Sequence, residues 1–216
     1  MYKRQVTVGI HIAAPGLAVL PDSPIDQLGR QRLSTVYMPG YKITMLPDDV
    51  VKNYTLAEGQ DCPALSLYVR FDEASLTVLD SETRIEKVHI AANLRHDQLD
   101  QLVTAEWLED PDFQHAGAPP EFPMPRSELA FFWRLAQHLK AQREMVRGKP
   151  ETFNRPDYTF RLAREDQGLP PSGQETVSIG TRQRGAPLDL IVAEAMILAN
   201  STWGQWLASL GVPAIY

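Results

Sequence analysis

The sequence predicts an α+β fold in which a mixed, mainly antiparallel sheet is packed by helices, including one buried helix near the C-terminus. Three observations predict it: alternating apolar residues over Val6–Ile12, an amphipathic pattern over Ser127–Gly148, and a nearly all-apolar run over Leu190–Ala199. Alternation with a period of two is typical of a half-buried strand, and apolar residues at helical spacing indicate a packed helix. With 216 residues, 44% of them hydrophobic, the chain can bury one core, so we expect one domain or part of a larger one.

The N-terminal third begins with the Val6–Ile12 strand and continues into two predicted helices. Ser23–Asp26 contains a hydroxyl N-cap, a proline at the first helical position and a carboxylate three residues after the cap. This combination starts helices, so we expect a helix that runs through about Thr35. Leu46–Asp49 opens a shorter helix in the same way.

The middle of the chain is predicted to form strands and then one helix. Strand composition is found over Ala64–Phe71, Ser75–Leu79 and Arg84–Ile90. Apolar residues at helical spacing predict a helix over Asp97–Leu108. The repeated Pro, Gly and Ala residues over Asp110–Pro125 indicate an exposed loop.

The C-terminal half is predicted to contain two long helices separated by a hairpin. The first helix begins at Ser127 and is closed by Gly148. Tyr158–Leu162 and Thr176–Thr181 have the composition of two paired strands. The last helix runs from Pro187 to about residue 210 and contains the apolar run. Because that run is apolar on every side except at Glu194, we expect the helix to pass through the interior of the protein.

The composition excludes several classes of function. Lys and Arg number 21 against 27 Asp and Glu, a net charge of -6, which argues against a module that holds nucleic acid by a uniformly basic face. A nucleic acid could then bind only in a local channel or with help from elsewhere. The single cysteine, Cys62, excludes an internal disulfide framework. Together with the lack of a bilayer-length apolar stretch or a secretory leader, it predicts a cytoplasmic protein with no membrane partner.

None of the common catalytic patterns occurs in the sequence. The five histidines have no metal-ligand spacing, and there is no Ser-His-Asp set, phosphate loop or dinucleotide fingerprint. Asp48 and Asp49 begin a helix, while Asp110 and Asp112 lie in the proline-rich stretch. We therefore predict no catalytic residue and no metal ligand within this chain.

Glu194 is the one ionisable residue inside the apolar run of the last helix. Burying an unpaired carboxylate costs several kcal/mol, so this side chain must be paired, protonated or turned to a wet cavity. Two interpretations stay open from the residues alone. Glu194 could pair with an arginine, for which Arg161, Arg182 and Arg184 are the candidates, or it could line a substrate channel.

An ordered set of residues lies between Asp26 and Ser66. It consists of Asp26, Arg32, Ser34, Tyr37–Gly40, Met45–Pro47, Leu56, Gly59 and Ala64–Ser66. This set resembles the middle of the catalytic RNB domain of the ribonuclease II and ribonuclease R family. The resemblance extends over nearly all of residues 6–216. It implies a processive 3′→5′ exoribonuclease that threads single-stranded RNA into an interior channel and releases nucleoside 5′-monophosphates.

The resemblance also implies a cofactor and partners. In the family, clustered aspartates hold Mg²⁺, which activates a water and stabilises charge at the scissile phosphate. The Val6–Ile12 strand is similar to the one that directly follows those aspartates, so the metal ligands are expected outside this chain. The parent is expected to be monomeric and to carry flanking OB-fold domains that bind RNA. As an isolated fragment, the chain is expected to be inactive.

Four residues are assigned to RNA binding by the resemblance. Ile191–Asn200 is similar to the family's interior helix, whose second glutamate contacts the 3′-terminal nucleotide, and Glu194 stands in that place. His96 occupies the position of a tyrosine that stacks on a base, and Phe153 falls near a second stacking aromatic. Arg184 falls near the position at which the family has an arginine ahead of this helix. A surface role for His96 and core packing for Phe153 remain open.

Residues 1–5 are interpreted as a non-native scar, because Tyr-Lys-Arg-Gln can be encoded by a sequence similar to the transposase ends used for sequencing libraries. Residues 6–216 then form a partial RNB domain that is truncated at both ends. The alternative is a non-catalytic RNA-binding or regulatory protein that uses the RNB scaffold as a platform.

Overall fold

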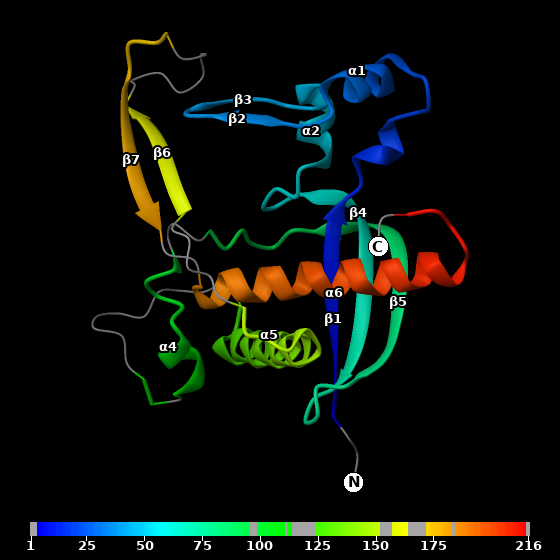
Figure 1. Cartoon of the computed structure of the whole chain (residues 1–216), viewed down its shortest axis with the longest axis vertical. Helices are drawn as coiled ribbons and strands as arrows, with labels where there is room; N and C mark the ends of the chain where they lie inside the picture. The colour runs from blue at the N-terminus through cyan, green and yellow to red at the C-terminus, as the bar shows by residue number, and fades with distance from the viewer. Residues whose placement is uncertain are drawn as a thin grey trace.

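The computed structural model describes residues 4–95, 99–110, 112–113, 124–151, 157–163, 172–182 and 185–214. A three-stranded sheet lies beside two long helices, and two small hairpins extend from the opposite end of the molecule (Figure 1). The predicted class is confirmed, since the described residues combine five α-helices with antiparallel sheets. The strands divide into three separate sheets, and every strand pair in the described residues is antiparallel.

The largest sheet has the strand order β1-β4-β5, with β1 at Gln5–Ala13, β4 at Asp61–Asp72 and β5 at Val78–His89. In the register between β1 and β4, Val8 lies opposite Val69. Because side chains alternate along a strand, the apolar residues of both strands share one face and form the core with the long helices. The core cluster contains Val8, Leu67, Val69, Phe71, Leu76, Leu135 and Ala199.

The turn between β4 and β5 replaces a predicted strand. Ser75–Leu79 was expected to form a strand of its own, and this prediction is wrong. The Asp72 carboxylate accepts hydrogen bonds from the main-chain N–H and the hydroxyl of Ser75, both at 2.9 Å, and Leu76 adopts a φ of 57°. These local bonds make a tight turn, after which β5 runs as one strand that also includes the predicted segment Arg84–Ile90 as far as His89.

The helices α5, at Arg126–Arg147, and α6, at Pro187–Ser209, pack against each other and against the sheet (Figure 1). Both were predicted. Helix α5 ends at Gly148, whose φ of 71° is the left-handed conformation expected of a glycine C-cap. Its neighbour α4, at Ala105–Glu109, is shorter than predicted, because Thr104 caps it by accepting a hydrogen bond from the N–H of Trp107.

Helix α6 is only partly buried, which corrects the predicted interior helix. Leu188, Glu194 and Ala199 are buried, but Val192 is 49% exposed and Met196 is 57% exposed. An apolar helix is enclosed only where neighbouring elements cover it, and in the described residues α5 and the sheet cover one side. The other side borders a cleft.

The segment between β1 and β4 contains a short 3₁₀ helix, two α-helices and a hairpin. Ser23 accepts the capping hydrogen bond from the N–H of Asp26 as predicted. The helix that follows ends at Arg32 rather than near Thr35, because Leu33 takes a φ of 60°. The elements are η1 at Pro15–Ala18, α1 at Pro24–Arg32, β2 at Val36–Met38, β3 at Tyr41–Ile43 and α2 at Asp48–Tyr54.

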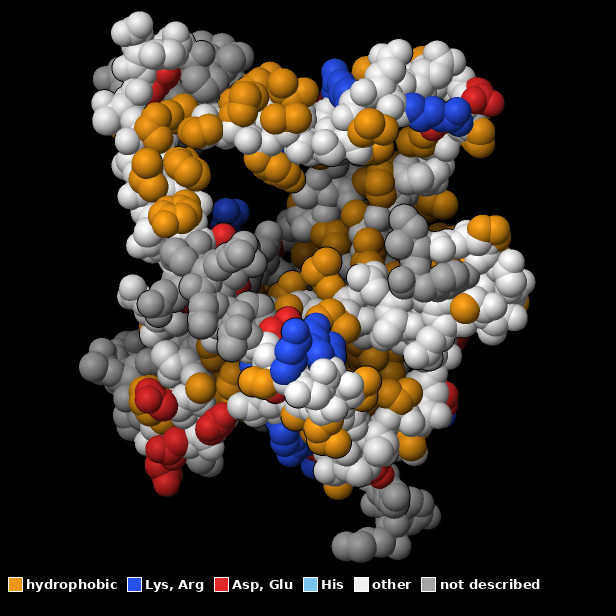
Figure 2. All heavy atoms as spheres, in the orientation of Figure 1, with side chains coloured by type: hydrophobic (Ala, Val, Ile, Leu, Met, Phe, Trp, Pro, Cys, Tyr) orange, Lys and Arg blue, Asp and Glu red, His pale blue; other side chains and the backbone are white. Residues whose placement is uncertain are grey.

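A second hairpin, formed by β6 at Asp157–Ala163 and β7 at Thr176–Arg182, meets the first one. The two touch where a β-carbon on Gly40 would lie 2.7 Å from Leu162 Cδ1, so this close approach requires a glycine. Both hairpins expose apolar side chains (Figure 2). None of the helices in the described residues combines the length and hydrophobicity that a bilayer crossing requires.

Candidate functional site

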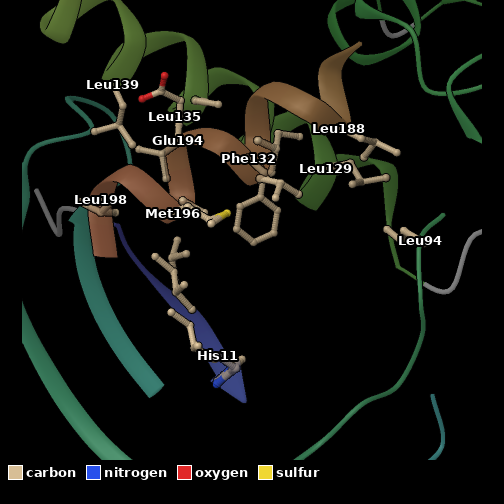
Figure 3. A pocket seen from close by; sticks show the side chains of 18 of the residues that line it. His11, Leu94, Leu129, Phe132, Leu135, Leu139, Leu188, Glu194, Met196 and Leu198 are labelled. Atoms are coloured by element: carbon tan, nitrogen blue, oxygen red, sulfur yellow. The ribbon is translucent and has the colours of Figure 1, made fainter. Parts of the chain in front are cut away.

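A cleft of about 600 Å³ opens between β1, α5 and α6 (Figure 3). Apolar side chains from all three elements form most of its wall, including Ile10, Phe132 and Met196. Among the described residues that line it, only His11 and Glu194 are ionisable. Its size lies within the range of small-molecule sites. The wall suits an apolar or aromatic group such as a nucleobase, and it offers few partners to a phosphate.

Glu194 is buried in an ion pair at the back of this cleft. Its side chain is 2% exposed, and Arg143 Nη2 donates to Glu194 Oε1 at 2.5 Å. Figure 3 shows the carboxylate turned toward α5 and away from His11. The same arginine nitrogen donates to Glu151 Oε2 at 2.6 Å. The two carboxylates, Glu151 first and Glu194 second, raise the pKa of Arg143 above its usual value, and the arginine in turn lowers the pKa of Glu151.

The partner of Glu194 was not among the three arginines considered from the sequence. Arg182 pairs instead with Asp100 and Asp189, Arg161 is exposed on β6, and Arg184 lies outside the described residues. Arg143 reaches Glu194 because α5 packs along α6. A signal was present in the sequence: Arg143 stands four residues after Leu139, on the stripe of α5 that faces the core.

This ion pair bears on both interpretations of Glu194. Pairing with an arginine satisfies a buried carboxylate without any ligand. Glu194 also borders a second opening of about 640 Å³ between α5 and α6, where Arg143 and Arg147 bring positive charge. The structure therefore gives Glu194 a structural partner and places it between two openings, while its contact with RNA stays a prediction.

The histidine in the cleft wall is held by a polar cluster that crosses the sheet. His11 Nδ1 lies 2.8 Å from the hydroxyl of Ser66, which is fully buried. Tyr68 donates its hydroxyl to Glu86 Oε1 at 2.7 Å. Hydrogen bonds from Tyr68 and then Ser66 lower the pKa of Glu86, and the bond to Glu86 raises the pKa of Tyr68. This cluster fixes the ring of His11, which the sequence analysis did not single out.

Three of the four predicted RNA-binding residues, His96, Phe153 and Arg184, lie outside the described residues. Cys62 is buried, and its thiol donates to the carbonyl oxygen of Thr55 at 3.0 Å.

The described residues do not form a metal site. In that part of the chain no three His, Cys, Asp or Glu side chains gather closely enough to hold an ion. The described residues therefore offer no fitting ligand set for the magnesium that the family resemblance implies. What the described cleft can do chemically is bind and orient.

The sequence matches the model of the RNB domain over residues 2–216. The chain belongs to the RNB-domain family. Relatives include Exoribonuclease 2 of Vibrio vulnificus, 29% identical over 201 residues that make up 92% of this chain and 27% of the relative. Exoribonuclease 2 of Edwardsiella piscicida is 30% identical over 88% of this chain and 27% of its own length. The resemblance to the ribonuclease II and ribonuclease R family is thus confirmed.

Several solved structures have a similar fold. Mycoplasma genitalium RNase R, in a complex with double-stranded RNA, superposes with a TM-score of 0.69 at 17% identity over 95% of this chain and 33% of its own. The Dss1 exoribonuclease of Candida glabrata, in an active-site mutant, gives a TM-score of 0.71 at 19% identity over 97% of this chain and 27% of its own. Yeast Ssd1, described as a pseudonuclease, gives 0.51 at 20% identity over 68% of this chain and 16% of its own.

This chain spans about a quarter of the length of the curated relatives that it matches.

Proposed function

We propose that this chain is part of a 3′→5′ exoribonuclease, which in its intact form hydrolyses single-stranded RNA to nucleoside 5′-monophosphates with Mg²⁺. The observation that carries the proposal is the match to the RNB domain over residues 2–216, together with relatives named Exoribonuclease 2. The parent is proposed to be a monomer that works in the cytoplasm and carries flanking OB-fold domains. The single buried cysteine is consistent with a reducing compartment.

Within the parent, the described residues contribute binding surfaces rather than chemistry. The apolar cleft beside β1 and α6 suits unstacked bases, whose flat faces favour aromatic and aliphatic walls. Glu194, His96, Phe153 and Arg184 are the proposed contacts near the 3′ end. In this proposal Arg143 fixes the direction of the Glu194 carboxylate.

The 216-residue chain by itself is proposed to be inactive and to bind RNA weakly. Its net charge of -6 gives no broad attraction for a polyanion. The test is to incubate the pure chain with a labelled poly(A) oligomer and Mg²⁺. We expect no nucleoside monophosphates, and release that EDTA abolishes would contradict the proposed inactivity.

A second candidate is a non-catalytic RNA-binding protein on the RNB scaffold. One observation favours it: the fold is similar to that of Ssd1, described as a pseudonuclease. Fluorescence anisotropy separates the two candidates. Submicromolar binding of single-stranded RNA by the isolated chain, without hydrolysis, would favour this second function, whereas weak binding that declines further with salt is expected of the nuclease fragment.

A further inference from the structure

One guanidinium nitrogen serves two carboxylates at the back of the cleft. Arg143 Nη2 donates to Glu194 Oε1 at 2.5 Å and to Glu151 Oε2 at 2.6 Å. Glu194 belongs to α6, whereas Glu151 lies in the segment that follows α5. The two carboxylates share one donor, so either of them can hold the arginine if the other leaves it.

Glu151 is the better anchored of the two carboxylates. Its main-chain N–H donates to Glu144 Oε1 at 2.8 Å, and its second carboxylate oxygen lies 3.7 Å from Arg147 Nη1. Glu194, by contrast, has Arg143 as its one hydrogen-bond partner in the described residues. Glu151 would therefore stay with Arg143 if Glu194 moved.

The apolar cleft lies beside Glu194. This residue is one of those that line the opening of about 600 Å³, although its carboxylate is turned toward α5 (Figure 3). A carboxylate enters an apolar space only when a donor meets it there, because an unpaired buried charge is costly. Two neighbouring hydroxyls are suitable donors, since each oxygen of a carboxylate can accept one hydrogen bond. The 2′- and 3′-hydroxyls of a ribonucleoside have this arrangement, and its base suits the apolar wall.

The charge of Arg143 decides whether the carboxylate can make this move. The arginine side chain is only 21% exposed. If Glu194 were its only carboxylate, turning Glu194 into the cleft would leave a largely enclosed guanidinium without a counter-charge, which is strongly unfavourable. Because Glu151 is present, the arginine keeps a carboxylate at 2.6 Å throughout the move.

We propose that Glu151 is a positioning residue, which holds Arg143 so that the Glu194 carboxylate can leave the arginine and accept hydrogen bonds from the vicinal hydroxyls of a ribonucleoside in the cleft. The proposal rests on the proposed contact between Glu194 and the 3′ end of RNA. Arg143 directs the carboxylate only until a ligand arrives, and the control of the exchange belongs to a residue on a different segment. The exchange involves no RNA hydrolysis, so the 216-residue chain can show it by itself.

The test compares the binding of adenosine and 2′,3′-dideoxyadenosine to the whole 216-residue chain by NMR titration. Both nucleosides carry the same base, and only adenosine has the two hydroxyls. We expect adenosine to bind about tenfold more tightly, the difference that one charge-assisted hydrogen bond makes. The carboxyl carbon signal of Glu194, assigned from its loss in Glu194→Gln, should shift with adenosine and stay in place with the dideoxy analogue.

Two neighbouring glutamates provide the matched variants. Glu151→Gln removes the charge and keeps the shape, so Arg143 then depends on Glu194, and the preference for adenosine should fall to within about twofold. Glu144→Gln is the control, because Glu144 lies in the same cluster but contacts Lys140 and the N–H of Glu151 rather than Arg143. It should keep the preference. A purely structural role of Glu151 would instead weaken the binding of both nucleosides alike.

A third variant tests whether Glu151 acts through Glu194. Glu194→Gln should abolish the preference for adenosine, and adding Glu151→Gln to it should change the preference no further. Denaturation midpoints show which variants fold. The signal of Glu194 in the unaltered chain tests the exchange even if Glu151→Gln does not fold.

Four outcomes would overturn the proposal. The first is that neither nucleoside binds to the unaltered chain, or that both bind equally. The second is a Glu194 carboxyl signal that adenosine does not shift. The third is a preference that survives Glu151→Gln in a folded protein, and the fourth is a preference that Glu144→Gln also removes. None of these measurements depends on RNA hydrolysis, so a failure here is distinct from a failure of the proposed nuclease function.

Discussion

Two arginines beside helix α6 each lie between two carboxylates and are similarly exposed, but one of the four carboxylates is far more buried than the others. Arg143 lies between Glu151 and Glu194, and Arg182 lies between Asp100 and Asp189. In both cases the carboxylates raise the pKa of the arginine. The side chains of Asp100 and Asp189 are 24% and 22% exposed, whereas that of Glu194 is 2% exposed.

This difference shows that the composition of an ion-pair network does not set its energetic weight. A carboxylate that keeps access to water can exchange a lost partner for solvent, so its pairing contributes little net stability. A carboxylate enclosed in the interior has no such replacement, and removing its partner leaves an unpaired buried charge. The Arg143 network should therefore be the more sensitive of the two. The predictions below test this contrast, from the largest expected effect to the smallest.

Arg143→Ala should be the most destabilising change, because Glu194 has no other hydrogen-bond partner in the described residues. We expect the free energy of unfolding to decrease by about 3 to 5 kcal/mol. Arg182→Ala is the matched control and should cost about 1 kcal/mol. Urea denaturation of both variants measures the two values, and equal losses would contradict the contrast.

Glu194→Ala should cost less than Arg143→Ala, since the arginine keeps its bond to Glu151. We expect a loss of about 2 kcal/mol, in the range of one charge-assisted hydrogen bond. The corresponding change at the other network, Asp189→Ala, should cost about 1 kcal/mol or less. If Glu194→Ala proved as damaging as Arg143→Ala, Glu151 would not be an adequate second partner. If the Glu194→Ala variant instead remains stably folded, the same substitution in an intact parent can be used to measure RNA turnover.

The pH dependence of stability provides a third test. Arg143 holds the pKa of Glu151 below its ordinary value of 4.5, so folding favours the charged carboxylate. This contribution is complete above pH 4.5 and is lost as the pH falls through the lowered pKa. Glu151→Gln should therefore reduce the difference in denaturation midpoint between pH 6 and pH 3 compared with the unaltered chain. An unchanged difference would mean that Glu151 contributes nothing to the acid sensitivity.

Raising the salt concentration should have the smallest effect on stability, and it should weaken the more exposed ion-pair network more than the buried one. Ions screen exposed charges more than buried ones. In thermodynamic cycles, raising the NaCl concentration should weaken the coupling between Arg182 and Asp189 by a few tenths of a kcal/mol, about the scale of an exposed pair. The coupling between Arg143 and Glu194 should change less. A larger effect of salt on the coupling between Arg143 and Glu194 than on that between Arg182 and Asp189 would mean that the Glu194 pair is the more accessible one.

Most helices and strands follow from local patterns in the sequence. Alternation identifies β1, and the N-cap at Ser23 and the C-cap at Gly148 locate helix ends, because each depends on residues within a few positions of one another. The strand predicted at Ser75–Leu79 is the instructive exception. Its composition suits a strand, but the Asp72 carboxylate accepts a hydrogen bond from the N–H of Ser75 and stabilises a turn there. Such a local hydrogen bond outweighs the weak β-propensity of the segment.

The sequence by itself determined the family, the order of the main elements and the importance of a lone carboxylate in an apolar helix. Only the tertiary structure decided which arginine pairs with Glu194, because Arg143 is 51 residues away and only the packing of α5 on α6 brings them together. It also decided that Val192 and Met196 of α6 are exposed and that, within the described residues, β1 pairs on one side only, with β4. Burial and strand order depend on which elements pack against one another. The residue pattern of a single segment does not specify which other elements it packs against.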